Sequence, residues 1–267
     1  MDAMPTPQSH ETLDILLRGR LRLLQSRHGH RTSVDSLALA WFAGLLLAQR
    51  VQSGAVPQVL DLGAGTGMVA LTVGLAVPQT LLTLVELQPA QADRARRNVI
   101  LNGLDERAQV WVYDLSDPWP LPAPRADLVV CNPPFRVPGT GVAPAVAERR
   151  LAHFESTATL TVFAQRAAQA LAPGGVTAWV FPWRERERLL LALATAGLEA
   201  HLCPLLHREG DTTPVRALFA AWQPSPQSAA AMDLTFPSWL ALHATTGLED
   251  HYHPDLEAFI AQARQAR

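Results

Sequence analysis

The stretch Asp61-Leu62-Gly63-Ala64-Gly65-Thr66-Gly67 follows a short apolar run that begins at Val56. The leucine and β-branched residues before the glycines favour a buried strand, and the residues after them favour a helix. A tight glycine turn between a strand and a helix lets an adenosine-type ligand lie against bare backbone. The third glycine lies one position too early for the dinucleotide-binding pattern. We therefore expect a nucleoside-bearing cofactor at this turn.

Short apolar runs alternate with amphipathic segments on both sides of this stretch, without an internal repeat. The alternation predicts an α/β fold in which a doubly wound sheet of seven strands has helices on both faces. The expected strands lie at 56–62, 80–86, 109–113, 126–131, 176–181, 199–207 and 215–222. The expected helices include 34–49, 89–102, 157–171 and 184–196, and a turn is expected at Pro173-Gly174-Gly175.

Three parts of the chain are expected. An N-terminal hairpin and cover helix occupy residues 1–52, the main domain occupies 53–223, and a linker with a tail occupies 224–267. We expect the hairpin to pair Leu21 to Gln25 with the Arg27 to Arg31 stretch, centred on Gly29. In the tail we expect a strand pair around Gly247 and a short helix over 254–265.

Composition limits the class of protein. A chain of 267 residues suits one large domain with small extensions. The first fifteen residues lack the basic and apolar segments of a signal peptide, and no apolar run reaches membrane-spanning length, so we expect a cytoplasmic protein. Two cysteines exclude a disulfide framework. The net charge of −2, with arginine as every basic residue, means that any nucleic-acid binding must use local patches.

Acidic residues close two further strands. Glu86 lies nineteen positions beyond Gly67, and Asp114 ends the third expected strand. Glu86 can accept hydrogen bonds from ribose hydroxyls, whereas Asp114 can accept from an adenine amine while the amide of Leu115 faces the ring. The expected cofactor-binding residues are Asp61, Gly63, Ala64, Gly65, Gly67, Glu86, Leu87, Asp114, Leu115 and Asn132.

The tetrapeptide Asn132-Pro133-Pro134-Phe135 ends the fourth expected strand, where open α/β sheets bind ligands. A planar amine is a poor nucleophile because its lone pair is delocalised. An enzyme must therefore bind the N–H groups of the amine with hydrogen-bond acceptors, which favour the pyramidal, attacking form. Asn132 offers a side-chain carbonyl, Pro133 offers a backbone carbonyl, and Phe135 can stack on the planar group. These three are the expected catalytic residues, and the chemistry requires no metal.

A non-periodic segment rich in Gly, Pro, Val and Ala follows from Arg136 to Ala147, and we expect it to cover a substrate. Arg136, Arg149 and Arg150 are candidate substrate-binding residues that either meet phosphates or form a solvated face. His153 and Glu155 either touch RNA or hold this loop, and we favour the second. His251 and His253 have no partner acids arranged around them, so no metal site is expected.

With these motifs in place, the chain resembles S-adenosylmethionine-dependent methyltransferases that carry an Asn-Pro-Pro-Tyr or Asn-Pro-Pro-Phe motif. These enzymes act on amines of adenine or guanine, or on a glutamine amide. More closely, it is similar to the bacterial tRNA adenine-N6 methyltransferases that modify the adenosine 3′ of the anticodon in a valine tRNA. The similar segments are 21–26, 31–37, 61–67, 85–89, 96–98, 101–103 and 131–135, within a similarity that covers most of 12–222.

The resemblance implies a Rossmann-like class I methyltransferase fold, S-adenosyl-L-methionine as the cofactor, and RNA, in particular tRNA, as the partner. It implies that Asn132 and Phe135 hold the target base. It also places Arg31, Ser33 and Asp35 in a segment that closes over the cofactor. Helix capping is an equal alternative for Ser33 and Asp35.

Other acceptors stay open. Phe135 stands where many adenine enzymes of this kind have tyrosine, and guanine-N2 enzymes of ribosomal RNA also have phenylalanine there. The alternatives are guanine N2 in ribosomal RNA and glutamine in a release factor. A cofactor-binding RNA chaperone without turnover is a further alternative, against which the intact Asn132-Pro133-Pro134-Phe135 speaks.

Overall fold

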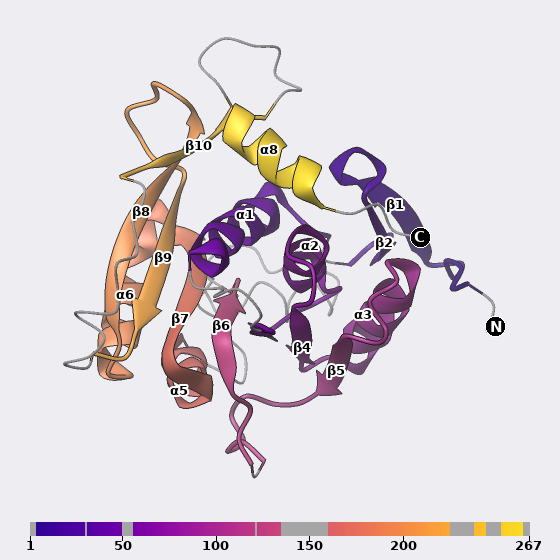
Figure 1. The fold of residues 1–267 in the computed structure, drawn as a ribbon, viewed down its shortest axis with the longest axis horizontal. Helices are drawn as coiled ribbons and strands as arrows, with labels where there is room; N and C mark the ends of the chain where they lie inside the picture. The colour runs from indigo at the N-terminus through magenta and orange to yellow at the C-terminus, as the bar shows by residue number, and fades with distance from the viewer. Residues whose placement is uncertain are drawn as a thin grey trace.

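An eight-stranded sheet forms the centre of the computed structural model (Figure 1). The structure describes residues 4–29, 31–49, 56–120, 122–134, 160–224, 238–243 and 252–263. The strand order is β10-β8-β9-β7-β6-β3-β4-β5. The strands are β3 (Gln58–Leu62), β4 (Leu81–Glu86), β5 (Ala108–Val112), β6 (Ala126–Cys131), β7 (Leu171–Pro182), β8 (Glu199–Arg208), β9 (Arg216–Trp222) and β10 (Leu240–His243).

Strands β3 to β7 run parallel to one another, and β9 runs antiparallel to both β7 and β8. Because β10 is parallel to β8, the carboxyl ends of seven strands lie at one edge of the sheet. The seven expected strands are confirmed to within a few residues. β10 is an eighth strand that the sequence did not predict.

Helices cover both faces of the sheet, as expected for a doubly wound fold. One apolar core lies between the sheet and α1, α2, α3 and α8, and a second lies between the sheet and α5 and α6. The helices are α1 (Val34–Ala48), α2 (Met68–Ala76), α3 (Pro89–Leu101), α5 (Leu160–Ala170), α6 (Arg186–Thr195) and α8 (Pro254–Gln262). Among the described residues, no helix is long and apolar enough to cross a membrane.

The N-terminal hairpin differs from the predicted one. β1 (Glu11–Leu16) pairs antiparallel with β2 (Leu21–Ser26) through a turn that contains η1 (Leu17–Gly19). Gly29 lies beyond β2 in a bend, where its N–H donates to the Ser26 hydroxyl at 2.9 Å. The prediction failed because two of the three left-handed residues in the real turn, Leu17 and Arg18, are not glycine.

Two further details correct the prediction. The expected turn at Pro173-Gly174-Gly175 lies inside β7, where the register with β6 shifts by several residues. In the tail, β10 pairs with β8 rather than with a neighbouring tail strand, and residues around Gly247 lie outside the described part. The expected helix from residue 254 is confirmed as α8, which lies across α1 and α2 (Figure 1).

Candidate functional site

Strand register brings the predicted motifs together. Leu62 at the end of β3 lies opposite Val85 of β4 on one side and Cys131 of β6 on the other. The next residues along these strands are Gly63, Glu86 and Asn132. The glycine loop, the acidic strand end and the Asn-Pro-Pro turn therefore occupy neighbouring positions at the carboxyl edge of the sheet.

The glycine loop turns the chain sharply from β3 into α2. The N–H groups of Gly63 and Ala64 both donate to the Val85 carbonyl at 2.9 Å. Gly65 has φ +56°, and no described atom lies within 4 Å of the place where a Cβ would stand. A ligand can therefore approach the backbone closely at Gly65. Gly67 is the N-cap residue of α2 with φ +90°, a conformation that favours glycine.

The carboxylate of Glu86 faces this loop. Its Oε2 accepts from the Gly65 N–H at 2.8 Å, and its Oε1 accepts from the Gln88 N–H at 2.8 Å. The side chain is buried, and burial raises the pKa of Glu86 above its usual value. A carboxylate fixed in this way is a suitable acceptor for hydroxyl groups next to the glycine backbone.

Asp61 is buried at the start of the loop and contacts the helix that follows it. Its Oδ2 accepts from the Ala70 N–H in the first turn of α2 at 3.2 Å, which satisfies an amide that has no partner within the helix. Burial, together with the nearby charge of Glu86, raises the pKa of Asp61 to about 7. The structure thus places Asp61 between β3 and α2.

Asp114 lies two residues beyond the end of β5. Its Oδ1 accepts from the Ser116 N–H at 2.8 Å, and the preceding Tyr113 N–H donates to the Glu86 carbonyl at 3.0 Å. Leu115 is buried, and its carbonyl accepts from Arg166 Nε at 2.8 Å. This segment is therefore held against the end of β4, beside Glu86. Leu87 is exposed next to it.

Asn132 is half-buried and faces the N-terminal turn of α1. Its Nδ2 donates to the Ser36 hydroxyl at 3.4 Å, and Pro133 behind it is buried. The neighbouring Cys131 is fully buried, which raises the pKa of its thiol well above the usual value and keeps it neutral. The residues expected to follow in the site, namely Phe135, Arg136, Arg149, Arg150, His153 and Glu155, lie outside the described residues.

The segment before α1 shows a division of roles. Arg31 turns toward the hairpin, where it donates to the Thr12 hydroxyl at 2.9 Å and pairs with Asp14. Ser33 is the N-cap residue of α1, but its side chain makes no capping bond, so the capping alternative is wrong for Ser33. Asp35 accepts from Arg216 Nε at 2.9 Å across to β9.

Two polar residues near the site were missed by the sequence reasoning. Ser36 contacts Asn132, and Arg216 anchors Asp35. Ser36 lay inside a segment that resembled the family, but nothing in its type or spacing indicated a partner ninety-six residues away. No group of three His, Cys, Asp or Glu side chains that could hold a metal occurs in the part of the chain that the structure describes.

Comparison with known proteins supplies the class. Residues 40–184, more than half of the chain, match the model of the methyltransferase small domain. The chain belongs to this family. It is therefore a methyltransferase, and the glycine loop of its α/β sheet lies within the matched region. The alternative of a binding protein without turnover is not supported.

Several curated relatives align over most of the chain. A tRNA1(Val) (adenine(37)-N6)-methyltransferase from Porphyromonas gingivalis strain W83 is 30% identical and aligns over 84% of this chain and 85% of its own length. A relative of the same name from another strain of this species is 29% identical over 91% of both chains. A release factor glutamine methyltransferase from Deinococcus radiodurans is 34% identical over 66% of both chains.

Solved structures show the same fold. Atu636 from Agrobacterium tumefaciens, a predicted O-methyltransferase, aligns with a TM-score of 0.60 over 85% of this chain and 97% of its own, at 20% identity. An O-methyltransferase family protein from Burkholderia thailandensis aligns with a TM-score of 0.51 over 73% of this chain and 57% of its own, at 16% identity. The Rossmann-like methyltransferase fold expected from the sequence is confirmed.

Proposed function

We propose that this methyltransferase transfers a methyl group from S-adenosyl-L-methionine to the exocyclic N6 amine of an adenine in RNA, in tRNA near the anticodon. The observation that carries the proposal is the position of Asn132-Pro133-Pro134, one strand from the glycine loop at the carboxyl edge of the sheet. The relatives named for adenine-37 of tRNA1(Val), which align over up to 91% of the chain, support this acceptor. This assignment places the activity in the cytoplasm.

The residues around the glycine loop fit the proposed cofactor. The open backbone at Gly65 accommodates a nucleoside, the Glu86 carboxylate can accept from two ribose hydroxyls, and Asp114 can accept from an adenine amine. When bound, this cofactor supplies an electrophilic methyl group on a sulfonium. We assign the contacts to Gly63, Gly65, Glu86 and Asp114, with Arg31 and Ser33 at the approach to the site.

Asn132 and Pro133 act on the amine by accepting hydrogen bonds from its N–H groups. Because Nδ2 of Asn132 donates to Ser36, the opposite end of the amide, Oδ1, is the acceptor presented to a substrate. Consecutive prolines fix φ at this turn and hold the Pro133 carbonyl in place. Two acceptors favour the pyramidal form of the amine, which restores its lone pair for attack. Orientation and electrostatics therefore take the place of a general base during the transfer, and the methylated nitrogen then loses its extra proton to water.

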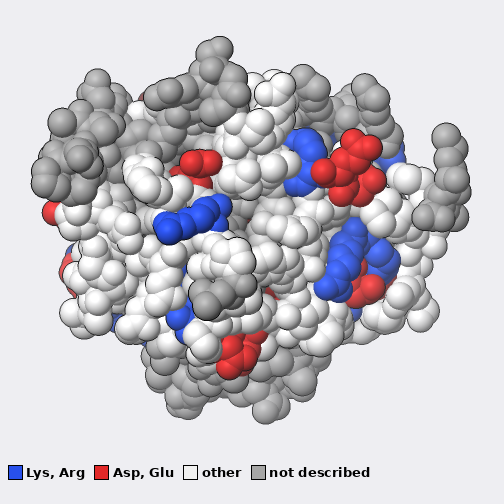
Figure 2. Space-filling model, turned by 60° about the horizontal axis from the view of Figure 1, so that its bottom comes forward, with Lys and Arg blue, Asp and Glu red and all other residues white. Residues whose placement is uncertain are grey.

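The proposed RNA contacts are local. On the face shown in Figure 2 the basic side chains form separate groups, most of them beside acidic side chains, rather than one continuous basic surface. The net charge of −2 agrees with this arrangement. We propose that Phe135 stacks on the target base and that Arg136, Arg149 and Arg150 contact phosphates, since they follow the Asn-Pro-Pro turn in sequence.

A glutamine side chain is the second candidate acceptor. The release factor glutamine methyltransferase relative has the higher identity, 34%, but aligns over only 66% of both chains, whereas the two tRNA methyltransferase relatives from Porphyromonas gingivalis align over 91% and 84% of this chain. An amide nitrogen has the same delocalised lone pair as an adenine amine. The Asn-Pro-Pro acceptors would serve both, so chemistry alone does not separate them.

Labelled methyl donor distinguishes the acceptors. The full chain is incubated with labelled S-adenosylmethionine and total RNA from a strain that lacks its gene, and the RNA is then digested to nucleosides. We expect N6-methyladenosine in the tRNA fraction. Label in N2-methylguanosine would show that the base is wrong, and label in protein alone would overturn the RNA assignment.

Asn132→Ala tests the role of the turn in the same assay. We expect transfer to fall by about a hundredfold or more, since an acceptor aimed at the reacting amine is lost. Binding of S-adenosylhomocysteine, measured by calorimetry, should change little. A variant that keeps normal transfer would overturn the assignment of Asn132.

A further inference from the structure

A single buried side chain, Asn98 of α3, joins the glycine loop to the N-terminal hairpin. Its Oδ1 accepts from the Leu24 N–H at 2.7 Å, and its Nδ2 donates to the Leu24 carbonyl at 3.2 Å. The same Nδ2 donates to the Thr66 carbonyl in the glycine loop at 2.9 Å. Asn98 has no exposed surface. Three buried backbone groups are thus satisfied by one amide.

Asn102, one turn further along α3, repeats half of this pattern. Its Oδ1 accepts from the Arg22 N–H at 3.0 Å, and its Nδ2 donates to the Arg22 carbonyl at 2.8 Å. The pattern repeats because the spacings match: two residues along a strand span about 6.7 Å, and four residues along a helix span about 6 Å. Asn102 therefore holds the free edge of β2 as Asn98 does, but it makes no described contact with the glycine loop.

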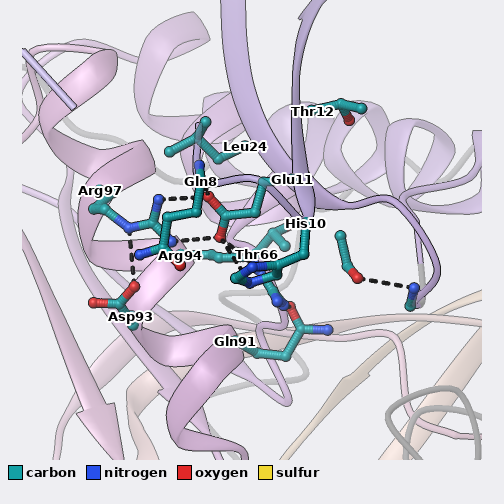
Figure 3. Close-up of polar contacts among 12 residues, drawn as sticks. Gln8, His10, Glu11, Thr12, Leu24, Thr66, Gln91, Asp93, Arg94 and Arg97 are labelled. Carbon is teal, nitrogen blue, oxygen red and sulfur yellow. Dashed lines mark hydrogen bonds and ion pairs between the residues drawn. The ribbon is translucent and has the colours of Figure 1, made fainter. Parts of the chain in front are cut away.

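The hairpin is anchored to the same helix by a buried ion cluster. Glu11 points from β1 toward α3, where Arg94 Nε lies 2.9 Å from Oε1 and Arg97 binds both carboxylate oxygens at 2.7 and 2.6 Å (Figure 3). These contacts lower the pKa of Glu11 to about 2. Arg94, Asn98 and Asn102 are spaced four residues apart, so these contacts with the hairpin lie along one face of α3.

The bond from Asn98 to the Thr66 carbonyl restrains a part of the loop that is otherwise free to change conformation. Thr66 stands between Gly65 and Gly67, two residues with left-handed φ values that could adopt several other conformations. Elsewhere in the loop, the Gly67 N–H donates to the Ala64 carbonyl at 2.8 Å and the Gly65 N–H donates to Glu86 Oε2 at 2.8 Å, but neither bond involves the Thr66 carbonyl. Asn98 therefore fixes, from α3, the peptide between Thr66 and Gly67, next to the open backbone at Gly65.

We propose that Asn98 is a positioning residue for the methyl donor: through the Thr66 carbonyl it holds the glycine loop in its binding conformation, and it links that conformation to the docked hairpin. This inference rests on the proposed donor. A loop that is already ordered loses less conformational entropy on binding, so its anchor contributes to affinity without touching the ligand.

Asn98→Ala and Asn102→Ala form a matched pair. Both variants remove two bonds to β2, but only Asn98→Ala also removes the bond to the loop. We expect S-adenosylhomocysteine, titrated by calorimetry into the full chain, to bind about three- to tenfold more weakly to Asn98→Ala and within about twofold of normal to Asn102→Ala. In turnover, Asn98→Ala should raise KM for S-adenosylmethionine while kcat stays within about twofold.

Thermal unfolding of both variants separates affinity from stability. The two should lose comparable stability, since each loses its hairpin bonds. Equal weakening of ligand binding by both variants, or none by either, would overturn the proposal. If the unaltered chain fails to bind S-adenosylhomocysteine at all, the proposed donor is wrong, which is a separate result.

Hydrogen exchange tests the same link without any substitution. The Leu24 N–H is held by Asn98, and the Arg22 N–H is held by Asn102. We expect S-adenosylhomocysteine to slow exchange of the Leu24 N–H more than that of the Arg22 N–H. A bound ligand orders the glycine loop, and the loop then restrains Asn98, which holds the Leu24 N–H. Equal changes at both amides would contradict the link.

Discussion

Ser36 gives the side-chain amide of Asn132, the proposed catalytic group, a preferred orientation. Its hydroxyl accepts from Asn132 Nδ2 at 3.4 Å, and its own N–H donates to the Ser33 carbonyl at 3.1 Å, so the hydroxyl is carried by the first turn of α1. Without this partner the amide can rotate and present nitrogen rather than oxygen to the substrate amine. The contact is long for a hydrogen bond, and its effect should be modest.

We therefore expect Ser36→Ala to lower kcat about two- to fivefold while binding of S-adenosylhomocysteine is unchanged. Steady-state kinetics and calorimetry measure the two quantities. Val34→Ala is the control, because Val34 lies in the same first turn of α1 and its side chain is exposed. Equal losses of kcat in both variants would remove the special role of Ser36.

Asp61 makes stability depend on pH in an unusual direction. Its pKa is raised from 3.8 to about 7, so the folded state binds a proton more tightly than the unfolded state. The contribution of Asp61 is thus fully present below about pH 4 and is lost as the pH rises to about 7. We expect Asp61→Asn, which still offers an oxygen to the Ala70 N–H, to be less sensitive to pH over this range.

The measurement is urea unfolding at pH 5 and pH 8 for both proteins. Between pH 5 and pH 8, the change in unfolding free energy should differ between the two proteins by about 2 to 4 kcal/mol. Asp127→Asn serves as the control, since Asp127 also accepts a backbone N–H, from Gln58, but is only half-buried. Identical slopes in the normal chain and Asp61→Asn would contradict the assignment.

At the scale of elements, the packing of the hairpin against α3 is stabilised by the carboxylate of Glu11. Glu11 is buried with two arginines, and its pKa is lowered from 4.5 to about 2. Its stabilising contribution is therefore present above pH 4.5 and is lost as the pH falls toward 2. We expect Glu11→Gln to cost about 2 to 4 kcal/mol at pH 7, because the buried guanidinium of Arg94 loses its ion pair with the Glu11 carboxylate.

Denaturant unfolding at pH 7 and pH 3.5 tests this expectation. The difference between Glu11→Gln and the normal chain should shrink at the lower pH. Asp93→Asn is the matched control, because Asp93 also pairs with Arg97 but its side chain is 56% exposed, so its loss should cost less than about 0.5 kcal/mol. A similar cost for both substitutions would show that burial of Glu11 does not matter.

The elements that carry the site were predictable because local signals specify them. A glycine loop after an apolar run, an acid at the next strand end and an Asn-Pro-Pro turn fix where β3, β4 and β6 end. Parallel pairing then brings those ends to one edge of the sheet. This is why the positions of Gly63, Glu86 and Asn132 could be predicted without the structure.

Other features depend on contacts between distant segments and left no local signal. Asn98 contacts Leu24, seventy-four residues away, and any asparagine on a helix surface has the same sequence appearance. The real hairpin turn uses Leu17 and Arg18 in conformations that usually indicate glycine. β10 has only four residues and joins the sheet because the edge of β8 is available to it.

At the scale of the whole molecule, the tail and hairpin close over the helices of the catalytic domain. Arg18 pairs with Glu257 of α8 at 2.6 Å, and Arg20 Nε donates to the Ala263 carbonyl at 2.9 Å. On the same side, Phe259 of α8 packs over Gly44 of α1. Most of these contacts involve residues outside the matched methyltransferase segment, 40–184, so the ends of the chain complete the core of the family domain.

Gly44 provides a test of this closure. A Cβ at residue 44 would lie 2.4 Å from Phe259 Cε2, so Gly44→Ala must displace the phenyl ring and the helix that carries it. We expect a loss of about 1 to 3 kcal/mol in unfolding free energy, with faster hydrogen exchange in α8. This loss opposes the usual gain of about 0.5 to 1 kcal/mol when alanine replaces glycine inside a helix.

The sign of the effect should therefore reverse when the ring is removed. In a Phe259→Ala background the new methyl group has room, and Gly44→Ala should then stabilise the chain by up to about 1 kcal/mol. Denaturant unfolding of the two single variants, the double variant and the normal chain completes the cycle. If Gly44→Ala destabilises both backgrounds equally, the strain lies within α1 and the packing of α8 is not its cause. If it stabilises both, α8 is not held closely against α1 at this position.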